Sequence, residues 1–129
     1  MSEQLLLMLL AAAAGGVGAA LRFVVDGAVT RRLAQRARGQ AYPYGILVVN
    51  LSGSLLIGFL LGAAGPIHPL VTVFGVGALG GYTTFSTASF DTVRLLRRGR
   101  PLAAFANGLG QLVLAVAAAA AGFALGALL

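Results

Sequence analysis

A run of hydroxyl side chains inside an apolar segment is the first feature that could support chemistry. Residues 75–89 read GVGALGGYTTFSTAS, in which small residues precede six hydroxyl-bearing ones, namely Tyr82, Thr83, Thr84, Ser86, Thr87 and Ser89. Gly80 and Gly81 weaken a helix, and threonine hydroxyls can bond carbonyls that a break releases. Inside a membrane, irregular backbone is tolerated only where it is buried in protein or lines a cavity. The pattern predicts a broken transmembrane helix that offers carbonyls to a cation and hydroxyls to a solute, unless the small residues simply pack against a neighbouring helix.

Amide side chains interrupt two other apolar segments at helical spacing. Asn50 and Ser54 are four residues apart and share one helix face, as do Asn107 and Gln111 further along the chain. Their N–H groups donate hydrogen bonds, which is what an anion requires. Each amide could instead bond a neighbouring helix, but two such stripes and the hydroxyl run together favour one polar track. No carboxylate lies in the middle of an apolar run, so the acidic path typical of cation or proton transport is not indicated.

Arg22 is a charged residue within the first apolar run. An ionised side chain at membrane depth costs on the order of 3 kcal/mol unless it is paired or reaches the headgroups. Asp26 follows four residues later, the spacing of a pair on one helix surface. Arg22 is therefore either an interfacial residue that reaches the headgroups or part of an electropositive vestibule that attracts an anion.

Four apolar runs must position these groups. The chain has 129 residues, of which 59% are hydrophobic and 9% charged, and its mean hydropathy is +0.95. This composition predicts an all-α membrane protein with one domain, residues 1–129, and no cysteine for a disulfide or thiolate site. Small residues four apart, such as Gly58 and Gly62 or Gly122 and Gly126, predict faces through which helices pack. We expect transmembrane helices at about residues 5–29, 44–64, 70–93 and 101–127, each near the ~20 residues that span a bilayer, with the third one broken.

The charges predict the orientation of the chain. Its net charge of +6 comes from nine arginines without any lysine. A soluble protein of this charge would suggest nucleic acid, but here the arginines lie between apolar runs, so membrane lipid is the expected partner and nucleic acid is not. Eight of them fall in the first and third connections: Arg31, Arg32, Arg36, Arg38, Arg94, Arg97, Arg98 and Arg100. Successive helices alternate in direction, so these eight share one side, and the positive-inside rule predicts a multi-pass protein of the cell membrane with both termini outside.

Three segments carry a resemblance to a known family. GGVGAALRF at residues 15–23, VVNLSGSLLIGFL at 48–60 and GALGGYTTFSTAS at 77–89 resemble the CrcB/Fluc fluoride channels in order and spacing. The resemblance implies a passive, fluoride-selective channel that exports cytoplasmic fluoride down its gradient and so reduces fluoride toxicity. It also implies an antiparallel dimer with two pores and a structural sodium ion at its centre, bound by backbone carbonyls at the break in the third helix.

The resemblance also implies roles for individual residues. Gly80 and Thr83 match the positions whose carbonyls bind sodium, and Arg22 matches the arginine of the first helix, in the vestibule. Asn50 matches the pore asparagine and Phe85 the first pore phenylalanine. With the polar residues noted above, the expected fluoride path consists of Asn50, Phe85, Ser86, Thr87, Asn107 and Gln111.

Several positions depart from the family pattern. Ala88 stands at the second pore phenylalanine, Asn107 and Gln111 replace a tyrosine and a serine of the fourth helix, and Ile46 replaces a threonine. A homodimer of antiparallel subunits requires one sequence to insert in both directions, which a strong arginine bias opposes. We therefore hypothesise a heterodimer with an oppositely oriented paralogue, and a homodimer is the alternative.

Two other functions remain as alternatives. A small proton-coupled multidrug exporter is also a four-helix protein with an antiparallel dimer, but it needs a carboxylate embedded in its first helix. Glu3 lies at the terminus and Asp26 beside Arg22, so neither fits. A non-conducting subunit that only completes the dimer and holds sodium would explain the residues at 88, 107 and 111. An enzyme is not indicated, because the sequence lacks a nucleophile–base pair, a metal cluster and a phosphate loop.

Overall fold

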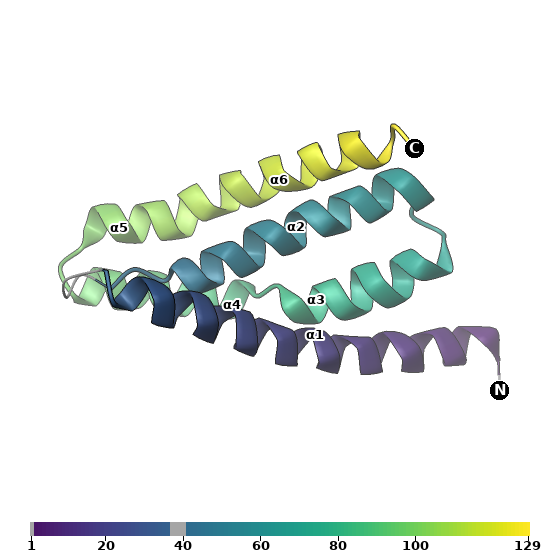
Figure 1. The fold of residues 1–129 in the computed structure, drawn as a ribbon, viewed down its shortest axis with the longest axis horizontal. Coiled ribbons are helices and arrows are strands. Elements are labelled where there is room, and N and C mark those ends of the chain that lie inside the picture. Colours follow the sequence, from purple (N-terminus) through teal and green to yellow (C-terminus); the bar gives the residue numbers. More distant parts are fainter. Residues whose placement is uncertain (1, 37–40) are drawn as a thin grey trace.

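The structure is a computed structural model that describes residues 2–36 and 41–129, and in those residues it is built from helices. Figure 1 shows these helices as long rods lying roughly along one direction. α1 (Glu3–Ala34) and α2 (Tyr44–Ala64) are each a continuous rod. The third rod consists of the π-helix η1 (Val71–Leu79), α3 (Gly80–Tyr82) and α4 (Phe85–Arg97), one after another. The fourth rod consists of α5 (Pro101–Phe105), the π-helical turn η2 (Ala106–Gly110) and α6 (Gln111–Gly126).

The predicted all-α membrane character is confirmed. Among the described residues, three helical stretches are long and apolar enough to cross a membrane: Glu3–Ala34, Tyr44–Ala64 and Pro101–Gly126. The remaining expected span is divided into η1, α3 and α4, none of which is long enough alone to cross a bilayer. The antiparallel dimer remains a prediction.

α1 extends beyond both ends of the expected helix. The hydroxyl of Ser2 accepts a hydrogen bond from the N–H of Leu5 at 3.3 Å and caps the helix start. Arg31 and Arg32, which we expected in a loop, form the last turn, where cations interact favourably with the free carbonyls. Arg36 follows the helix, whereas Arg38 lies outside the described residues.

Glycines let α2 and α6 pack with their backbones in contact. A Cβ atom added at Gly58 would meet the backbone of Ala119, and one added at Gly122 would meet the backbone of Leu55 and Phe59. Gly62 and Gly126 are equally close to the opposite helix. The packing faces predicted from small residues four apart are thus confirmed.

Glycines also bring the backbone of α1 into contact with the backbones of η1 and α3. A Cβ atom at Gly18 would meet the backbone of Ala78 and Tyr82, and one at Gly81 would meet the backbone of Gly15. Contacts this close fix the position of α3 against α1. They hold the end of α3, where the rod is interrupted, against α1.

The two ends of the bundle differ in charge. Figure 1 places both termini at one end, together with the connection between α2 and η1. The end of α1 and the connection between α4 and α5 lie at the opposite end (Figure 1). The arginine-bearing segments therefore gather at one end of the molecule, which is the arrangement that alternating helices require.

The interior is polar for so apolar a chain. The buried side chains among the described residues include five apolar ones and four polar ones, namely Ile46, Val49, Val71, Leu95, Ala104, Asn50, Thr84, Asn107 and Gln111. Large apolar side chains of every rod point outward instead. This inverted pattern suits a protein whose surroundings are lipid or another subunit.

Candidate functional site

The break in the third rod lies at Thr83 and Thr84. Both residues have extended backbone, with φ and ψ of −76° and 157° at Thr83 and −149° and 125° at Thr84. The Thr83 hydroxyl donates to the carbonyl of Leu79 at 3.0 Å, and the Thr84 hydroxyl accepts from the N–H of Thr87 at 3.2 Å. Threonine side chains thus close α3 and cap α4, as the sequence pattern predicts.

Asn50 replaces the backbone hydrogen bond that the Thr84 N–H loses at the break. Its Nδ2 donates to the carbonyl of Thr84 at 2.8 Å, and its Oδ1 accepts from the N–H of Thr84 at 2.8 Å. Both residues are buried, with 9% of Asn50 and 7% of Thr84 exposed. The Thr84 N–H would otherwise lie inside the bundle without a partner, at a cost of about 1–3 kcal/mol.

The break also releases carbonyl oxygens. In a continuous helix the Gly80 carbonyl would accept from the N–H of Thr84, and the Thr83 carbonyl from that of Thr87. Those two N–H groups instead bond Asn50 and the Thr84 hydroxyl. Arg22 of α1 approaches one of the released oxygens, since its Nη1 lies 3.4 Å from the Thr83 carbonyl oxygen. Carbonyl oxygens are ligands that hard cations accept, so the chemistry of these groups is compatible with a cation such as sodium.

A cavity of about 540 Å³ lies beside the break. It lies between α2, α4 and the rod of η2 and α6, and its lining includes five of the predicted site residues: Asn50, Thr83, Phe85, Asn107 and Gln111. Ser54, Thr84, Ser89 and Thr92 add hydroxyl groups to the wall. The lining contains no carboxylate and no arginine. The cavity therefore offers neutral hydrogen-bonding groups rather than a fixed charge.

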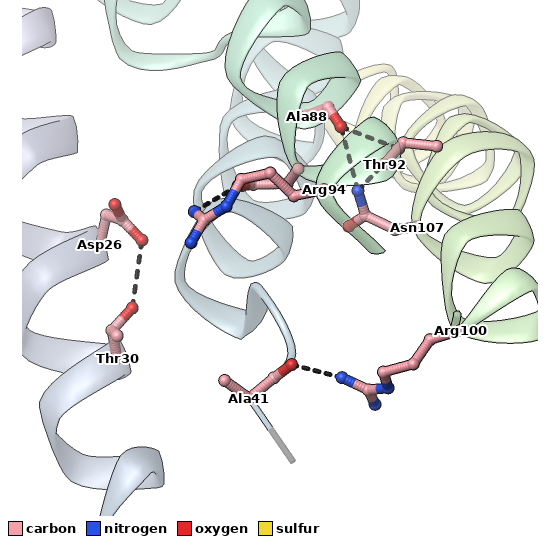
Figure 2. Close-up of polar contacts among 9 residues, drawn as sticks. Asp26, Thr30, Ala41, Ala88, Thr92, Arg94, Arg100 and Asn107 are labelled. Carbon is pink, nitrogen blue, oxygen red and sulfur yellow. Dashed lines mark hydrogen bonds and ion pairs between the residues drawn. The ribbon is translucent and has the colours of Figure 1, made fainter. Parts of the chain in front are cut away.

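Asn107 is held inside the bundle by α4. Its Nδ2 donates to the Ala88 carbonyl at 3.0 Å and to the Thr92 hydroxyl oxygen at 2.9 Å, and Thr92 donates to the same carbonyl at 2.8 Å (Figure 2). The Asn107 side chain is fully buried. It belongs to η2, and π-helical turns within helices are frequent at functional sites.

Three buried polar atoms at the cavity have no hydrogen-bond partner within the described part of the chain. They are Oδ1 of Asn107 and both Oε1 and Nε2 of Gln111, whose side chain is only 4% exposed. Buried polar atoms are nearly always paired. Their concentration at one cavity leaves hydrogen-bonding groups there that water or a polar ligand could satisfy.

Comparison with known proteins identifies the family. A family model described as CrcB-like protein, Camphor Resistance (CrcB), matches residues 9–123. This chain belongs to the CrcB family. The fluoride-specific ion channel FluC 2 of Mycobacterium tuberculosis is 44% identical over 108 residues, which are 84% of this chain and 81% of that protein. FluC 1 of Leifsonia xyli subsp. xyli is 38% identical over 126 residues, 95% and 88% of the two chains, and FluC 1 of Rubrobacter xylanophilus is 40% identical over 114 residues, 88% of each.

Not every predicted site residue of this CrcB protein reaches the cavity. Ser86 is exposed, and Thr87 faces a second cavity of about 410 Å³ near the arginine-rich end. Both side chains remain linked to the break, because the Thr84 hydroxyl lies 3.2 Å from that of Ser86 and 3.1 Å from that of Thr87. Phe85 lines the cavity, but its side chain is 82% exposed.

Arg22 and Asp26 have the spacing of a pair on one helix surface, but they do not form an ion pair. Asp26 accepts from the Thr30 hydroxyl at 3.3 Å (Figure 2), and Arg22 turns toward the released carbonyl of Thr83. An arginine beside a released carbonyl gains a partner without leaving the bundle, and a nearby hydroxyl serves the carboxylate. Among the described residues the ion pair that does form joins Arg94 to Asp91 at 3.5 Å.

The connection before α2 is attached to the start of α5. Arg100 donates from Nη1 to the Ala41 carbonyl at 2.5 Å (Figure 2). Tyr42 lies next to this contact and stacks at a tilt on Tyr44, with ring centroids 4.8 Å apart. Partial burial raises the pKa of Tyr42, the neighbouring Tyr44 raises it further, and Arg100 opposes both effects. These contacts join the ends of the rods on the arginine-rich side of the CrcB protein.

Thr92 is the site residue that the sequence analysis missed. It lies one helical turn after Ala88, so the two share the face that Asn107 contacts. The four-residue spacing between positions 88 and 92 is the sequence signal that would have placed Thr92 at the site. The hydroxyl run in the sequence ends at Ser89, and Thr92 continues it by one further turn toward the arginine-rich end.

Proposed function

We propose that this CrcB protein is one subunit of a passive channel through which fluoride leaves the cytoplasm down its gradient, so that fluoride toxicity is reduced. The observation that carries the proposal is the cavity beside the break, lined by amide and hydroxyl groups without a carboxylate. Such a lining offers hydrogen-bond donors to an anion and no negative charge that would repel it. The relatives named fluoride-specific ion channels match this chain over most of its length, which supports fluoride as the anion.

The same lining favours a channel over a proton-coupled exporter. Exchange of protons for a cation needs an ionisable group at membrane depth. The cavity has no such group, and Asp26 and Asp91 lie at the second cavity near the arginine-rich end. A path built only from neutral donors and acceptors has nothing to couple transport to a proton gradient, so we expect passive flow.

A second subunit is part of the proposal because one chain leaves the break uncovered on one side. Phe85 and Phe90 are 82% and 63% exposed, and Ser86 and Ser89 are exposed on the same stretch of helix. Hydroxyl groups and interrupted backbone at membrane depth require a protein or water partner rather than lipid. We expect an antiparallel partner to cover this face and to complete the pore walls.

The proposed sodium ion would lie between the two subunits. The released carbonyls of Gly80 and Thr83 are only two oxygens from one chain, and a hard cation needs more oxygen ligands than two. The matching carbonyls of the partner would add a second pair. The ion would join the two broken helices and would replace the contact between Arg22 and the Thr83 carbonyl. Removal of sodium is therefore expected to weaken the dimer and to stop efflux together.

We infer that the partner is an oppositely oriented paralogue, with this chain placed termini-outside. Its arginine-bearing segments lie at one end of the bundle and its termini at the other, which opposes insertion in both directions. The relatives carry the numbers 1 and 2, as in organisms that encode two such proteins. Because the chain lacks cysteine, Ser2→Cys and Arg36→Cys can be labelled with a membrane-impermeant thiol reagent. Labelling of Ser2→Cys alone on intact cells is expected, and equal labelling of both would support a homodimer.

A subunit that does not conduct is the second candidate, and one observation favours it. The amide nitrogen of Asn107 is already bonded to Ala88 and Thr92, and Ala88 lacks the ring that the family pattern places there. This half of the dimer then has fewer groups free to bind a passing anion. The partner would carry the flux, and this chain would complete the fold and the sodium site.

Fluoride efflux from liposomes tests the proposal. Liposomes loaded with potassium fluoride would hold this chain alone, the partner alone or both, and an electrode would follow fluoride in the external solution. We expect efflux when both subunits are present and none from matched liposomes loaded with chloride. An absence of fluoride efflux from every combination would refute the proposed function. If the mixture still passes fluoride after the amides of Asn50 and Gln111 are removed from this chain, the result would favour the non-conducting role.

A further inference from the structure

The unpaired atoms at the cavity differ in hydrogen-bonding character. Nε2 of Gln111 carries two N–H donors, whereas Oε1 of Gln111 and Oδ1 of Asn107 can only accept. Both side chains line the cavity, Gln111 is 4% exposed and Asn107 is fully buried. The cavity wall thus presents donors and acceptors side by side, without partners from the described part of the chain.

The orientation of the Asn107 amide follows from its surroundings. A carbonyl oxygen accepts hydrogen bonds and cannot donate them, so the end of Asn107 at 3.0 Å from the Ala88 carbonyl must be Nδ2. Thr92 already directs its hydroxyl hydrogen at that carbonyl and offers its oxygen to Nδ2. The free end of Asn107 is therefore an acceptor. For Gln111 either orientation leaves one donor end and one acceptor end facing the cavity.

A bare anion would satisfy only part of this wall. It could accept from the Gln111 N–H groups, but it would lie near two oxygens that carry partial negative charge and need donors. A water molecule can donate one hydrogen to such an oxygen and the other to the anion. The cavity of about 540 Å³ has room for an anion and several waters, because a water occupies roughly 30 Å³ in the liquid.

We propose that Asn107 and Gln111 form a hydrated anion site, in which the Gln111 N–H groups donate to the anion and waters bridge it to Oδ1 of Asn107 and Oε1 of Gln111. This site rests on the proposed function, that the chain binds a small passing anion. It makes Gln111 a residue that determines the hydration of the anion. An anion that keeps part of its water shell in this cavity meets a lower dehydration cost here than at a wall of donors alone.

The experiment uses the full chain in its dimer, with Gln111→Met as the test and Gln35→Met as the matched control. Gln35 is exposed at the end of α1, so the same chemical change is made far from the cavity. Side-chain amide resonances of the ¹⁵N-labelled protein would be recorded during a titration with sodium fluoride. The Gln111 pair is assigned by its absence in Gln111→Met, and cross-peaks to water are measured by rotating-frame Overhauser spectra.

The hydrated site predicts three results. The Gln111 amide resonances shift saturably with fluoride, they show a cross-peak to water, and Gln111→Met lowers fluoride efflux about tenfold relative to Gln35→Met, as loss of one good hydrogen bond would. A dry cavity gives the opposite pattern, with no water cross-peak and a higher melting temperature for Gln111→Met, because an unpaired buried amide is then removed.

The possible results distinguish failure of the hydrated site from failure of the proposed function. Wild-type dimers that pass no fluoride would refute the function, whatever the resonances show. Wild-type dimers that pass fluoride but lack the water cross-peak, or whose efflux is unchanged in Gln111→Met, would overturn the hydrated site alone.

Discussion

The α2–α6 contact and the helix break hold backbone against backbone by opposite means. Between α2 and α6 the glycines remove side chains, so that backbone atoms touch directly. At the break a side chain is added instead, because Asn50 supplies the acceptor that the Thr84 N–H has lost and a donor to the Thr84 carbonyl. The α2–α6 contact depends on the absence of side-chain atoms at the glycines, whereas the break depends on Oδ1 and Nδ2 of Asn50. Small residues thus assemble the bundle, and single polar side chains create the irregular backbone that the cavity needs.

The difference extends to what each region can do. Where the glycines bring α2 and α6 together, the contacts are made by helical backbone whose N–H and C=O groups bond within each helix, so they leave little with which to bind an ion. The break releases carbonyls on one side and lies beside a polar cavity on the other. We therefore assign the proposed function to the region where the regular hydrogen-bond pattern is interrupted, since irregular backbone at membrane depth generally lines a cavity or is buried in protein.

Replacement of Asn50 is the strongest test of the break. Asn50→Leu keeps a similar volume but removes both bonds to Thr84, so that a buried N–H loses its partner and the carbonyl, which still accepts within α4, loses one of two. We expect the free energy of unfolding in mixed micelles to fall by about 2–4 kcal/mol, since an unpaired N–H costs roughly 1–3 kcal/mol and an ordinary hydrogen bond contributes about 1 kcal/mol. Fluoride efflux is expected to fall with it.

Ser52→Ala is the control for Asn50→Leu. Ser52 lies on the same helix and its hydroxyl is 3.1 Å from that of Tyr82, so its loss removes a contact between two side chains and leaves the backbone at the break paired. Its effect is expected to stay below about 1 kcal/mol. Equal losses in the two variants would mean that the break does not depend on Asn50.

Gly122→Ala tests the glycine contact in the same way. The added methyl group would meet the backbone of Leu55 and Phe59, and neither can move without displacing α2. Overpacking of this kind costs about 1–3 kcal/mol, so we expect a lower free energy of unfolding and a weaker α2–α6 contact. Gly16→Ala is the control, since a Cβ there meets nothing within 4 Å, and it is expected to be neutral or up to ~1 kcal/mol stabilising. Similar stability of the two variants would contradict direct backbone packing.

The sequence predicted the break better than it predicted the contacts of single side chains. The double glycine and the threonines at 83 and 84 indicated an interrupted helix because their local chemistry weakens and then caps a helix. The bond pair between Asn50 and Thr84 joins residues 34 positions apart, and no local pattern encodes such a distance. Asn50 was predicted as a pore residue from the family resemblance, and its part in holding the backbone became visible only in the structure.

The partner of the Arg22 charge is also one that sequence spacing alone does not predict. Its spacing to Asp26 favours an ion pair on one helix, yet it points to the Thr83 carbonyl of another rod. Local spacing describes only the partners on the same helix, whereas a released carbonyl elsewhere in the bundle competes for the charge. The end of α1 was placed too early for a related reason, since Arg31 and Arg32 can end a helix as readily as they can form a loop.

Thr92→Val is expected to lower the free energy of unfolding least of the three changes. It tests whether the hydrogen bond from Asn107 to Thr92 stabilises the contact between η2 and α4. Valine keeps the shape of threonine but removes the hydroxyl that accepts from Asn107 and donates to Ala88. Asn107 retains its bond to the Ala88 carbonyl, so a loss of about 1 kcal/mol in the free energy of unfolding is expected. Val93→Leu, at an exposed position next along the helix, is the control and is expected to have no measurable effect. If Thr92→Val matched that control, the network around Ala88 would add nothing to the bundle, and Asn107 would be positioned by the π-helical turn of η2 alone.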